Sequence, residues 1–306
     1  MKLGSSVIKS GTFTSSVAVT QSEIEAISSG QGTKSFTLEV TDVAGNTGIS
    51  SAVVVTLDKT APTGSITADT YYNSPTLSFT ISGSDTGGAV LEKMMVYIDS
   101  ETGTWENYTS GAYSKTVSLS QGSHIAHVKF KDSVGNESTV YDASFIVDTA
   151  APTGSISTVT YTNSRTITVS TASITDNISG VGYMKVWEDG QTIPTEWEAY
   201  ATSKSITLVE GSDGLRTIKA AFKDNAGNTT SANLSCTTTL DLDEPDAVLN
   251  LLKTDGNGLP AKVNYRNFKV RISHTAPDTS PIAQYKLSGD FDQSSTDWQV
   301  FTYDSG

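Results

Sequence analysis

The sequence predicts an all-β chain of tandem antiparallel β-sandwiches, and two observations lead to that fold class. Apolar and polar residues alternate in short runs, as in residues 77–81, 166–169 and 268–272, which is the pattern of a half-buried strand. The same markers also return at steps of 90 to 93 residues, a length that suits one small sandwich domain. The abundance of Thr and Ser and the scarcity of Leu favour strands over helices.

Three markers keep this period in the same order. The first is a Trp followed three residues later by an aromatic residue, the second is an Asp-x-x-Gly-Asn turn 27 residues further on, and the third is a linker that ends in Pro. The turn begins at Asp42, Asp132 and Asp224, and the linker ends at Pro62, Pro152 and Pro245. The Trp marker stands at Trp105 and Trp197, 92 residues apart, and returns at Trp298 after a longer step of 101 residues. Several markers at one period indicate a tandem array of one module.

These markers divide the chain into four repeats, arranged as beads on a string. The first repeat covers residues 1–58, the second 59–148, the third 149–242 and the fourth 243–306. The first is too short for a full copy, so it is a trimmed copy, an N-terminal anchor or a domain completed by another chain. The fourth is an incomplete copy. The one helix-like stretch is short, Ser22 to Ile27.

The charge and hydropathy of the chain exclude several classes of partner. The formal net charge is −13, which argues against binding to nucleic acid or to anionic membranes. No run of about 20 apolar residues is present, so no membrane insertion is expected. Lys2 is followed by Leu3-Gly4-Ser5-Ser6 and not by an apolar core, so the usual secretory route is not signalled. A virion protein, or an adhesin exported by another signal, fits this pattern.

Acidic loops are the best chemical signal in the sequence. Sandwich topology brings the linker Asp of one repeat to the same pole as two loops of the next repeat. Oxygen ligands from three loops suit Ca²⁺. The expected ligands are Asp58, Asp85, Asp132 and Asn136 at the first junction, Asp148, Asp176, Asp224 and Asn228 at the second, and Asp241 or Asp243 with Asp278 at a third. The alternative is that Asp, Asn and Gly serve only as turn formers, which needs no metal.

The repeated Trp and the single Cys each have two interpretations. Trp105, Trp197 and Trp298 are either core aromatics that fill the same hole in each repeat, or exposed residues that stack on sugars or anchor an interface. The core interpretation is favoured, because small sandwich cores depend on aromatic area. Cys236 is either a small apolar residue in a strand or the site of an intermolecular crosslink. One Cys excludes an intrachain disulfide.

No catalytic constellation is visible in the sequence. The histidines are His124, His127 and His274, and the first two lie close together without a partner that recurs in the other repeats. Leu215 and Ile218 stand in the corresponding stretch of the third repeat. There is no phosphate-binding loop, dinucleotide fingerprint or zinc spacing. A non-enzymatic protein is therefore expected.

The succession of strand, Asp-x-Ala-Gly-Asn turn, strand and Asp-x-Thr-Ala-Pro linker resembles the bacterial Ig-like and fibronectin-III-like repeats of large surface adhesins. This resemblance implies a long extracellular stalk, sometimes with Ca²⁺ at its junctions. The segments 197–218 and 285–298 also resemble Ig-like modules of tailed-phage virion proteins. The resemblance covers the end of the first repeat and the other three, and the linker at Asp243-Glu244-Pro245 departs from it.

The resemblance implies a structural virion component: a fibre, a tail or a capsid-surface protein that projects its domains. The alternatives are a bacterial cell-surface adhesin stalk and the accessory region of a secreted polysaccharide-degrading enzyme. The implied partners are other virion or surface-structure proteins, reached through the N-terminal repeat, and host-surface glycans. An oligomeric assembly on a virion surface is expected, with an extracellular or bacterial cell-surface location as the alternative.

Overall fold

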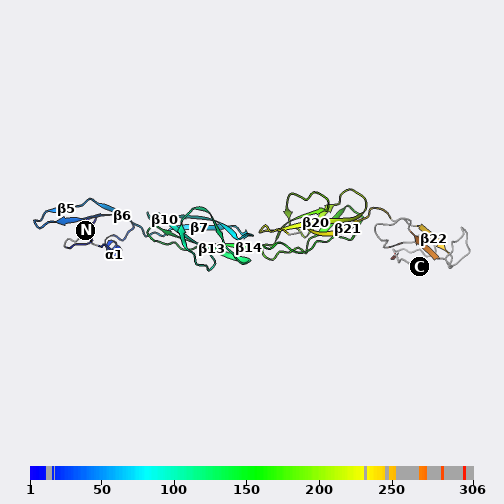
Figure 1. Ribbon diagram of the computed structural model, residues 1–306, viewed down its shortest axis with the longest axis horizontal. Helices are drawn as coiled ribbons and strands as arrows, with labels where there is room; N and C mark the ends of the chain where they lie inside the picture. The colour runs from blue at the N-terminus through cyan, green and yellow to red at the C-terminus, as the bar shows by residue number, and fades with distance from the viewer. Residues whose placement is uncertain are drawn as a thin grey trace. The chain divides into compact units, whose positions relative to one another are not determined.

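The computed structural model describes residues 1–11, 16, 18–230 and 233–244, and the backbone of four short strands after them. The chain divides into two compact units, Met1–Thr149 and Ala150–Gly306 (Figure 1). Antiparallel sheets dominate the described residues, so the all-β prediction is confirmed. In this part of the chain no helix has the length and apolar character needed to span a bilayer.

The first repeat combines one helix with a small sheet. The helix α1 (Gln21–Ile27) begins at Thr20, whose side chain forms a capping box with Glu23. The four-stranded sheet has the order β2-β1-β3-β6, and β4 and β5 form a separate hairpin. The strands are β1 (Lys2–Leu3), β2 (Ser6–Val7), β3 (Gly32–Thr37), β4 (Glu39–Thr41), β5 (Thr47–Ile49) and β6 (Val53–Leu57).

The second repeat is a complete sandwich of two sheets. One sheet has five strands in the order β11-β10-β13-β14-β8, and the other has three in the order β12-β9-β7. The strands are β7 (Thr63–Ala68), β8 (Tyr71–Tyr72), β9 (Thr76–Ser84), β10 (Leu91–Ile98), β11 (Trp105–Asn107), β12 (Gly111–Thr116), β13 (Gly122–Asp132) and β14 (Tyr141–Val147).

The core of this sandwich follows from the period-two pattern. Along β9 the side chains of Leu77, Phe79 and Ile81 are buried, and the residues between them are exposed. They pack against Met94, Val96 and Ile98 of β10 and against Ala126, Val128 and Phe130 of β13, so the two sheets share one apolar core. Gly64 is required there, because a Cβ at this position would stand 2.3 Å from the Phe130 ring.

The third repeat reproduces this topology. Its five-stranded sheet has the order β15-β21-β20-β17-β18, and β16 pairs with β19 opposite. The strands are β15 (Tyr161–Thr162), β16 (Thr166–Ser170), β17 (Val181–Glu188), β18 (Glu198–Ala199), β19 (Ser203–Thr207), β20 (Gly214–Asp224) and β21 (Leu234–Leu240). The counterpart of β7 is reduced to two isolated bridges, Thr153↔Thr175 and Ser157↔Ser170. The prediction that both repeats share one topology of seven or eight strands is confirmed.

The first repeat contains only the last two strands of this module. In the pair β3–β6, Lys34 lies opposite Val55, and in the pair β13–β14, His124 lies opposite Phe145. Each residue of the second pair stands 90 positions after its counterpart in the first. The opposing three-stranded sheet has no counterpart among the described residues of the first repeat. Val128 and Phe130 are fully buried, whereas their counterparts Leu38 and Val40 are each 45% exposed.

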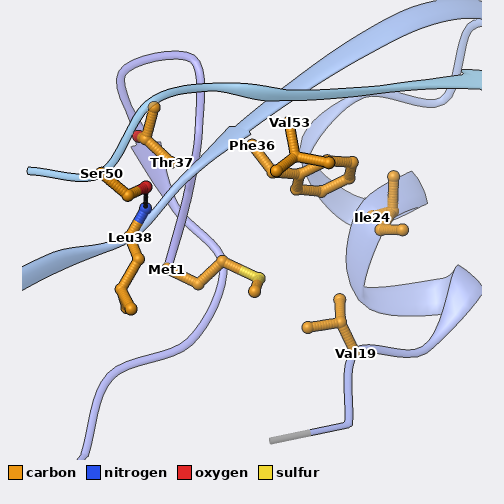
Figure 2. Close-up of a pocket in the computed structure, with 8 residues that line it drawn as sticks. All are labelled: Met1, Val19, Ile24, Phe36, Thr37, Leu38, Ser50 and Val53. Carbon is orange, nitrogen blue, oxygen red and sulfur yellow. Dashed lines mark hydrogen bonds between the residues drawn. The ribbon is translucent and has the colours of Figure 1, made fainter.

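The helix α1 and the N-terminus partly cover this open face. Figure 2 shows Ile24 of α1, Val19 and Met1 lying across from Phe36 and Val53 of the sheet. Between them lies a mainly apolar cavity of about 400 Å³, which Thr37, Leu38 and Ser50 also line. The first repeat therefore keeps an accessible apolar face where the second repeat has a closed core.

Beyond residue 244 only short strands are described. They are β22 (Val248–Leu252), β23 (Lys269–Ser273), β24 (Gln284–Tyr285) and β25 (Gln299–Val300), and they form two antiparallel pairs. The predictions for Trp298, Asp278 and His274 lie outside the described residues. The four-repeat division, with its boundaries at residues 58, 148 and 242, stays a prediction.

Candidate metal centre

Three carboxylates come together at one pole of the second repeat. Asp58 follows β6, Asp85 follows β9, and Asp132 is the last residue of β13. One carboxylate oxygen from each of them lies within 4.8 Å of the other two. Residues that are 27 and 47 positions apart in the sequence meet here because the three strands end at the same pole of the sandwich.

The Asp58 carboxylate is held by backbone N–H groups on two sides. Its Oδ1 accepts a hydrogen bond from the Thr60 N–H at 2.8 Å, and its Oδ2 accepts one from the Ala89 N–H at 2.7 Å. Burial is the largest single influence on this carboxyl and raises its pKa, but the two backbone hydrogen bonds, with a smaller effect of the adjacent Asp85 carboxyl, outweigh it, so the pKa of Asp58 is lowered. Asp58 is therefore a fixed and buried anion.

The Asp132 carboxylate closes the turn that follows β13. Its Oδ1 accepts hydrogen bonds from the backbone N–H groups of Val134, Gly135 and Asn136 at 2.7–3.0 Å. The Asn136 amide Nδ2 donates to Asp132 Oδ2 at 2.7 Å and to the carbonyl oxygen of Asp58 at 3.2 Å. The Asn136 nitrogen thus ties the turn to the linker.

This turn recurs in the other two repeats. Asp42 accepts from the Ala44 and Asn46 N–H groups, and Asp224 accepts from the Asn228 N–H and from its Nδ2. Asp42 does not belong to the cluster of Asp58, Asp85 and Asp132, yet it forms the same turn. Turn chemistry alone therefore accounts for the Asp-x-x-Gly-Asn motif, and the argument for a metal rests on Asp58 and Asp85.

Asp85 differs from its two neighbours. Both of its carboxylate oxygens are buried, and neither accepts a hydrogen bond of normal geometry. Burial and then the negative charge of Asp58 raise the pKa of Asp85, while the nearby N–H groups of Thr86 and Gly87 oppose this in part. Two buried oxygens without partners beside a second carboxylate are costly unless a cation neutralises them.

The surroundings of the cluster supply no cation. Within the described ranges no Lys, Arg or His forms an ion pair with Asp58, Asp85 or Asp132, and Lys59, the nearest basic residue in the sequence, pairs with Glu25 of α1 at 2.6 Å. Ca²⁺ binds oxygen at about 2.3–2.6 Å and accepts about six to eight ligands, so three oxygens within 4.8 Å of one another fit around it.

The expected ligands of the second junction belong to different compact units: Asp148 to the first, and Asp176 and Asp224 to the second. In the first unit, Asp148 follows β14 and its N–H donates to the Tyr72 carbonyl at 2.9 Å. In the second unit, Asp176 Oδ1 accepts from the N–H groups of Ile178, Ser179 and Gly180, so it caps its own turn. Asp85 has no such set of hydrogen bonds.

The expectation that Trp105 and Trp197 are core residues is wrong. Both are half-buried and lie outside the two core clusters. The ammonium group of Lys131 lies 4.3 Å above the Trp105 ring, and that of Lys185 lies 4.7 Å above the Trp197 ring. They occupy equivalent outward positions, at or beside edge strands β11 and β18.

The tyrosine of the same motif packs against the core instead. The Tyr108 ring packs on Phe130, and the Tyr200 ring packs on Phe222. The Tyr108 hydroxyl accepts from the Gly83 N–H at 2.8 Å, and the Tyr200 hydroxyl donates to the Thr171 carbonyl at 3.0 Å. Because Trp and Tyr are three residues apart on an edge segment, they face opposite sides of it, and the larger side chain is the outer one.

Cys236 and the histidines have defined surroundings. Cys236 packs partly buried against the core of the third repeat, as its apolar interpretation expected, and burial raises the pKa of its thiol. His124 contacts Asp99, and His127 contacts Asp142. The strand register places Arg216 and Lys219, not Leu215 and Ile218, at the corresponding positions, so the earlier expectation was displaced by one residue.

Residues 49–149 match the family model of the bacterial Ig-like domain, a segment that contains the whole second repeat and all three carboxylates. The second repeat is a bacterial Ig-like domain, and the fold of the described repeats is that of tandem Ig-like sandwiches. The third Ig-like domain has the strand order of the second, which extends the assignment beyond the matched segment. No curated protein sequence matches the array.

Solved structures similar to this Ig-like array include three bacterial or adhesin proteins. Fibronectin(III)-like modules of CbhA from Clostridium thermocellum are 18% identical, with 58% of this chain and 94% of that chain covered and a TM-score of 0.35. A Ca²⁺-stabilised, ice-binding adhesin of an Antarctic bacterium is 20% identical, with 74% and 61% covered and a TM-score of 0.36. A tetra-tandem repeat from the extending region of a large adhesion protein is 17% identical, with 81% and 72% covered and a TM-score of 0.27.

Proposed function

We propose that this chain is a non-enzymatic structural protein that spaces and displays Ig-like domains on a surface structure. The observation that carries the proposal is repetition: the second and third repeats keep the same strand order in the five-stranded sheet, the same turn and the same Tyr–Phe contact in the core. An active site would set one repeat apart from the others. Ig-like domains are typically non-catalytic, and their repetition extends reach.

We propose further that a divalent cation, Ca²⁺ by its preference for oxygen, stiffens the link between the first and second repeats. Asp58, Asp85 and Asp132 would hold it, and the unpartnered oxygens of Asp85 are the observation that supports it. The linker carboxylate and two loops of the following domain would then share one ion. In this role the cation supplies charge neutralisation and a fixed angle, and no chemistry.

The location of the protein is proposed as the surface of a phage virion, with a bacterial cell-surface stalk as the alternative. The virion version rests on the segments 197–218 and 285–298, and the stalk version is favoured by the match of residues 49–149 to the bacterial Ig-like family. In both versions the protein is exposed to the extracellular medium, where Ca²⁺ is abundant enough to fill weak sites.

We propose that the first repeat attaches the array to its neighbour. Its open sheet carries Leu38, Val40 and Val55, each at least 45% exposed, at positions that are buried in the second repeat. The partner that fits is an apolar β-sheet of another surface-structure protein, because the second repeat covers the same face with β7, β9 and β12. Host glycans are proposed as ligands of the outward Trp residues.

Immunogold electron microscopy of the source culture tests the location. Antibodies against the purified chain should label regular positions on particles or on the cell envelope. Label on particles supports the virion version, and label on the envelope supports the stalk. Label confined to the soluble fraction together with polysaccharide hydrolysis would overturn the structural proposal in favour of an enzyme accessory region.

A further inference from the structure

A buried cation recurs at one position of the repeat. The strands β3, β13 and β20 each begin with a glycine, and the third residue of each is basic: Lys34, His124 and Arg216. The residues paired with them are Val55, Phe145 and Thr238, each two residues before the end of its strand. Lys34 is 8% exposed, His124 is 7% exposed, and the Arg216 side chain is 16% exposed. Of these three residue types, only histidine has an ordinary pKa close to neutral pH.

His124 is enclosed by two hydrogen-bond acceptors. Its Nδ1 lies 2.7 Å from Asp99 Oδ2, and its Nε2 lies 2.8 Å from the carbonyl oxygen of Ser120. Neither the carboxylate nor the carbonyl has a proton to give, so both ring nitrogens must donate. Only the imidazolium form has two N–H groups. The neutral ring would place a bare nitrogen against an oxygen.

The third repeat makes the same connections with an arginine. Arg216 donates to Glu188 Oε1 at 3.0 Å and to the carbonyl oxygen of Ser212 at 2.7 Å. Ser212 stands 92 residues after Ser120, the same step that separates Arg216 from His124. In the second and third repeats this position therefore joins a carboxylate at the end of one strand to the loop before the strand that carries the cation. In the first repeat Lys34 donates to Ser28 Oγ at 2.7 Å.

The other groups around His124 leave Asp99 as its one charged partner. The ring stacks on Phe145 of β14 at 5.7 Å, and Ser120 belongs to the loop before β13. His127 on the same strand stacks on Tyr97 and pairs with Asp142, and its charge acts on Asp99 from a distance. In the described part of the chain no Lys or Arg pairs with Asp99.

We propose that His124 is held as an imidazolium and makes the stability of the second repeat depend on pH near neutrality, in contrast to the third repeat, which has Arg216 at this position. Burial lowers the pKa of His124, but the Asp99 carboxylate and the Ser120 carbonyl outweigh it, so the net shift is upward. A raised folded-state pKa means that the stabilisation is complete below about pH 6.5, the unfolded value, and is lost as the pH rises through the folded value. The third repeat keeps Arg216 charged throughout.

The difference between His124 and Arg216 has a mechanical consequence for the array. A tandem chain under load opens first at its least stable domain. At mildly acidic pH the second repeat has both hydrogen bonds of the His124 site, and at alkaline pH it has lost the charge that supports them. Alkaline conditions would therefore weaken the second repeat relative to the third, and acidic conditions would restore it.

The test follows the imidazole and the unfolding of the full chain together. With three histidines in the chain, His127→Gln and His274→Gln variants assign the His124 ring proton by NMR. The His124 resonance should titrate above pH 6.5. The first melting transition should fall by on the order of 5 °C between pH 6 and pH 8.5. In His124→Arg, which copies the third repeat, that fall should disappear.

The variant Asp99→Asn removes the carboxylate charge beside His124 and keeps the shape of the side chain. Asp99 has a φ of 52°, a conformation that Asn tolerates, so the turn should survive. This variant should move the His124 titration and the melting loss to lower pH together. If His124 titrates at or below 6.5 in the parent chain, or if the melting loss persists in both His124→Arg and His124→Gln, the proposal is wrong. His127→Gln, which removes the exposed His–Asp pair, should leave the loss unchanged.

Discussion

Gly87 lies so close to Asp58 that a Cβ at position 87 would stand 1.7 Å from the Asp58 Oδ1 atom. The loop from Asp85 to Ala89 thus wraps around the linker carboxylate, and its Ala89 N–H donates to Asp58 Oδ2 at 2.7 Å. Glycine is needed at 87 because the carboxylate occupies the space that a side chain would take. The loop of the second repeat and the linker before it are therefore built as one unit.

Gly87→Ala should displace the Asp58 carboxylate and disperse the three-carboxylate cluster. We expect a loss of about 1–3 kcal/mol in stability, the usual cost of overpacking, and loss of any response to Ca²⁺. Thermal unfolding in Ca²⁺ and in chelator measures both effects. Gly48→Ala is the matched control, since its nearest neighbour would be Val40 Cγ2 at 3.7 Å. Equal losses in the two variants would mean that the clash is unimportant.

Asp85→Asn should have opposite effects with and without the cation. Without Ca²⁺ it removes the repulsion between Asp58 and Asp85, so the melting temperature should rise above that of the parent. With Ca²⁺ it removes a ligand, so the parent should gain stability and the variant should gain little. Glu210→Gln, which changes a side chain that is 93% exposed, controls for net charge. A variant that still gains as much as the parent in Ca²⁺ would exclude Asp85 as a ligand.

The repulsion at Asp85 also predicts a pH dependence in chelator. A raised folded-state pKa means that the folded chain binds this proton more tightly than the unfolded chain. Stability from this group therefore rises as the pH falls through the folded value, while Asp58, whose pKa is lowered, contributes the opposite trend below its unfolded value of about 3.8. The advantage of Asp85→Asn over the parent should shrink toward zero as the pH falls. An advantage that is constant with pH would contradict the assignment.

Substituting the inward Tyr of the repeated motif should cost more unfolding free energy than substituting the outward Trp. Tyr108→Phe keeps the ring on Phe130 but leaves the partly buried Gly83 N–H without its acceptor, so we expect a loss of about 1–3 kcal/mol. Trp105→Phe removes only part of a half-buried surface ring and should cost less than about 1 kcal/mol. Denaturant unfolding of each variant measures the difference. A larger loss for Trp105→Phe would restore the Trp as the main stabilising residue.

Sequence patterns predicted the parts of this structure that depend on periodicity. The alternation around Leu77 to Ile81 and the 90-residue step gave the strands, the two-sheet repeat and the meeting of Asp58 with Asp85 and Asp132. They did not give the direction of Trp105, because a motif of Trp and Tyr three residues apart does not say which ring faces the core. They also missed the basic side chain that recurs at one position of the repeat, as Lys34, His124 and Arg216. Aligning the repeats on Gly122 and Gly214 places these residues in register.

The open face of the first repeat should control self-association. Val53 and Val54 are neighbours on β6 with similar exposures of 63% and 61%, but they point to opposite faces, and only Val53 lines the cavity beneath α1 (Figure 2). Val53→Lys should weaken association and the binding of an apolar dye, because it places a charge on the face that a partner sheet would cover. Val54→Lys should change neither, and sedimentation velocity with dye fluorescence compares them. If Val54→Lys weakens association as strongly, the exposed edge of β6 drives it, and the apolar face is not the attachment surface.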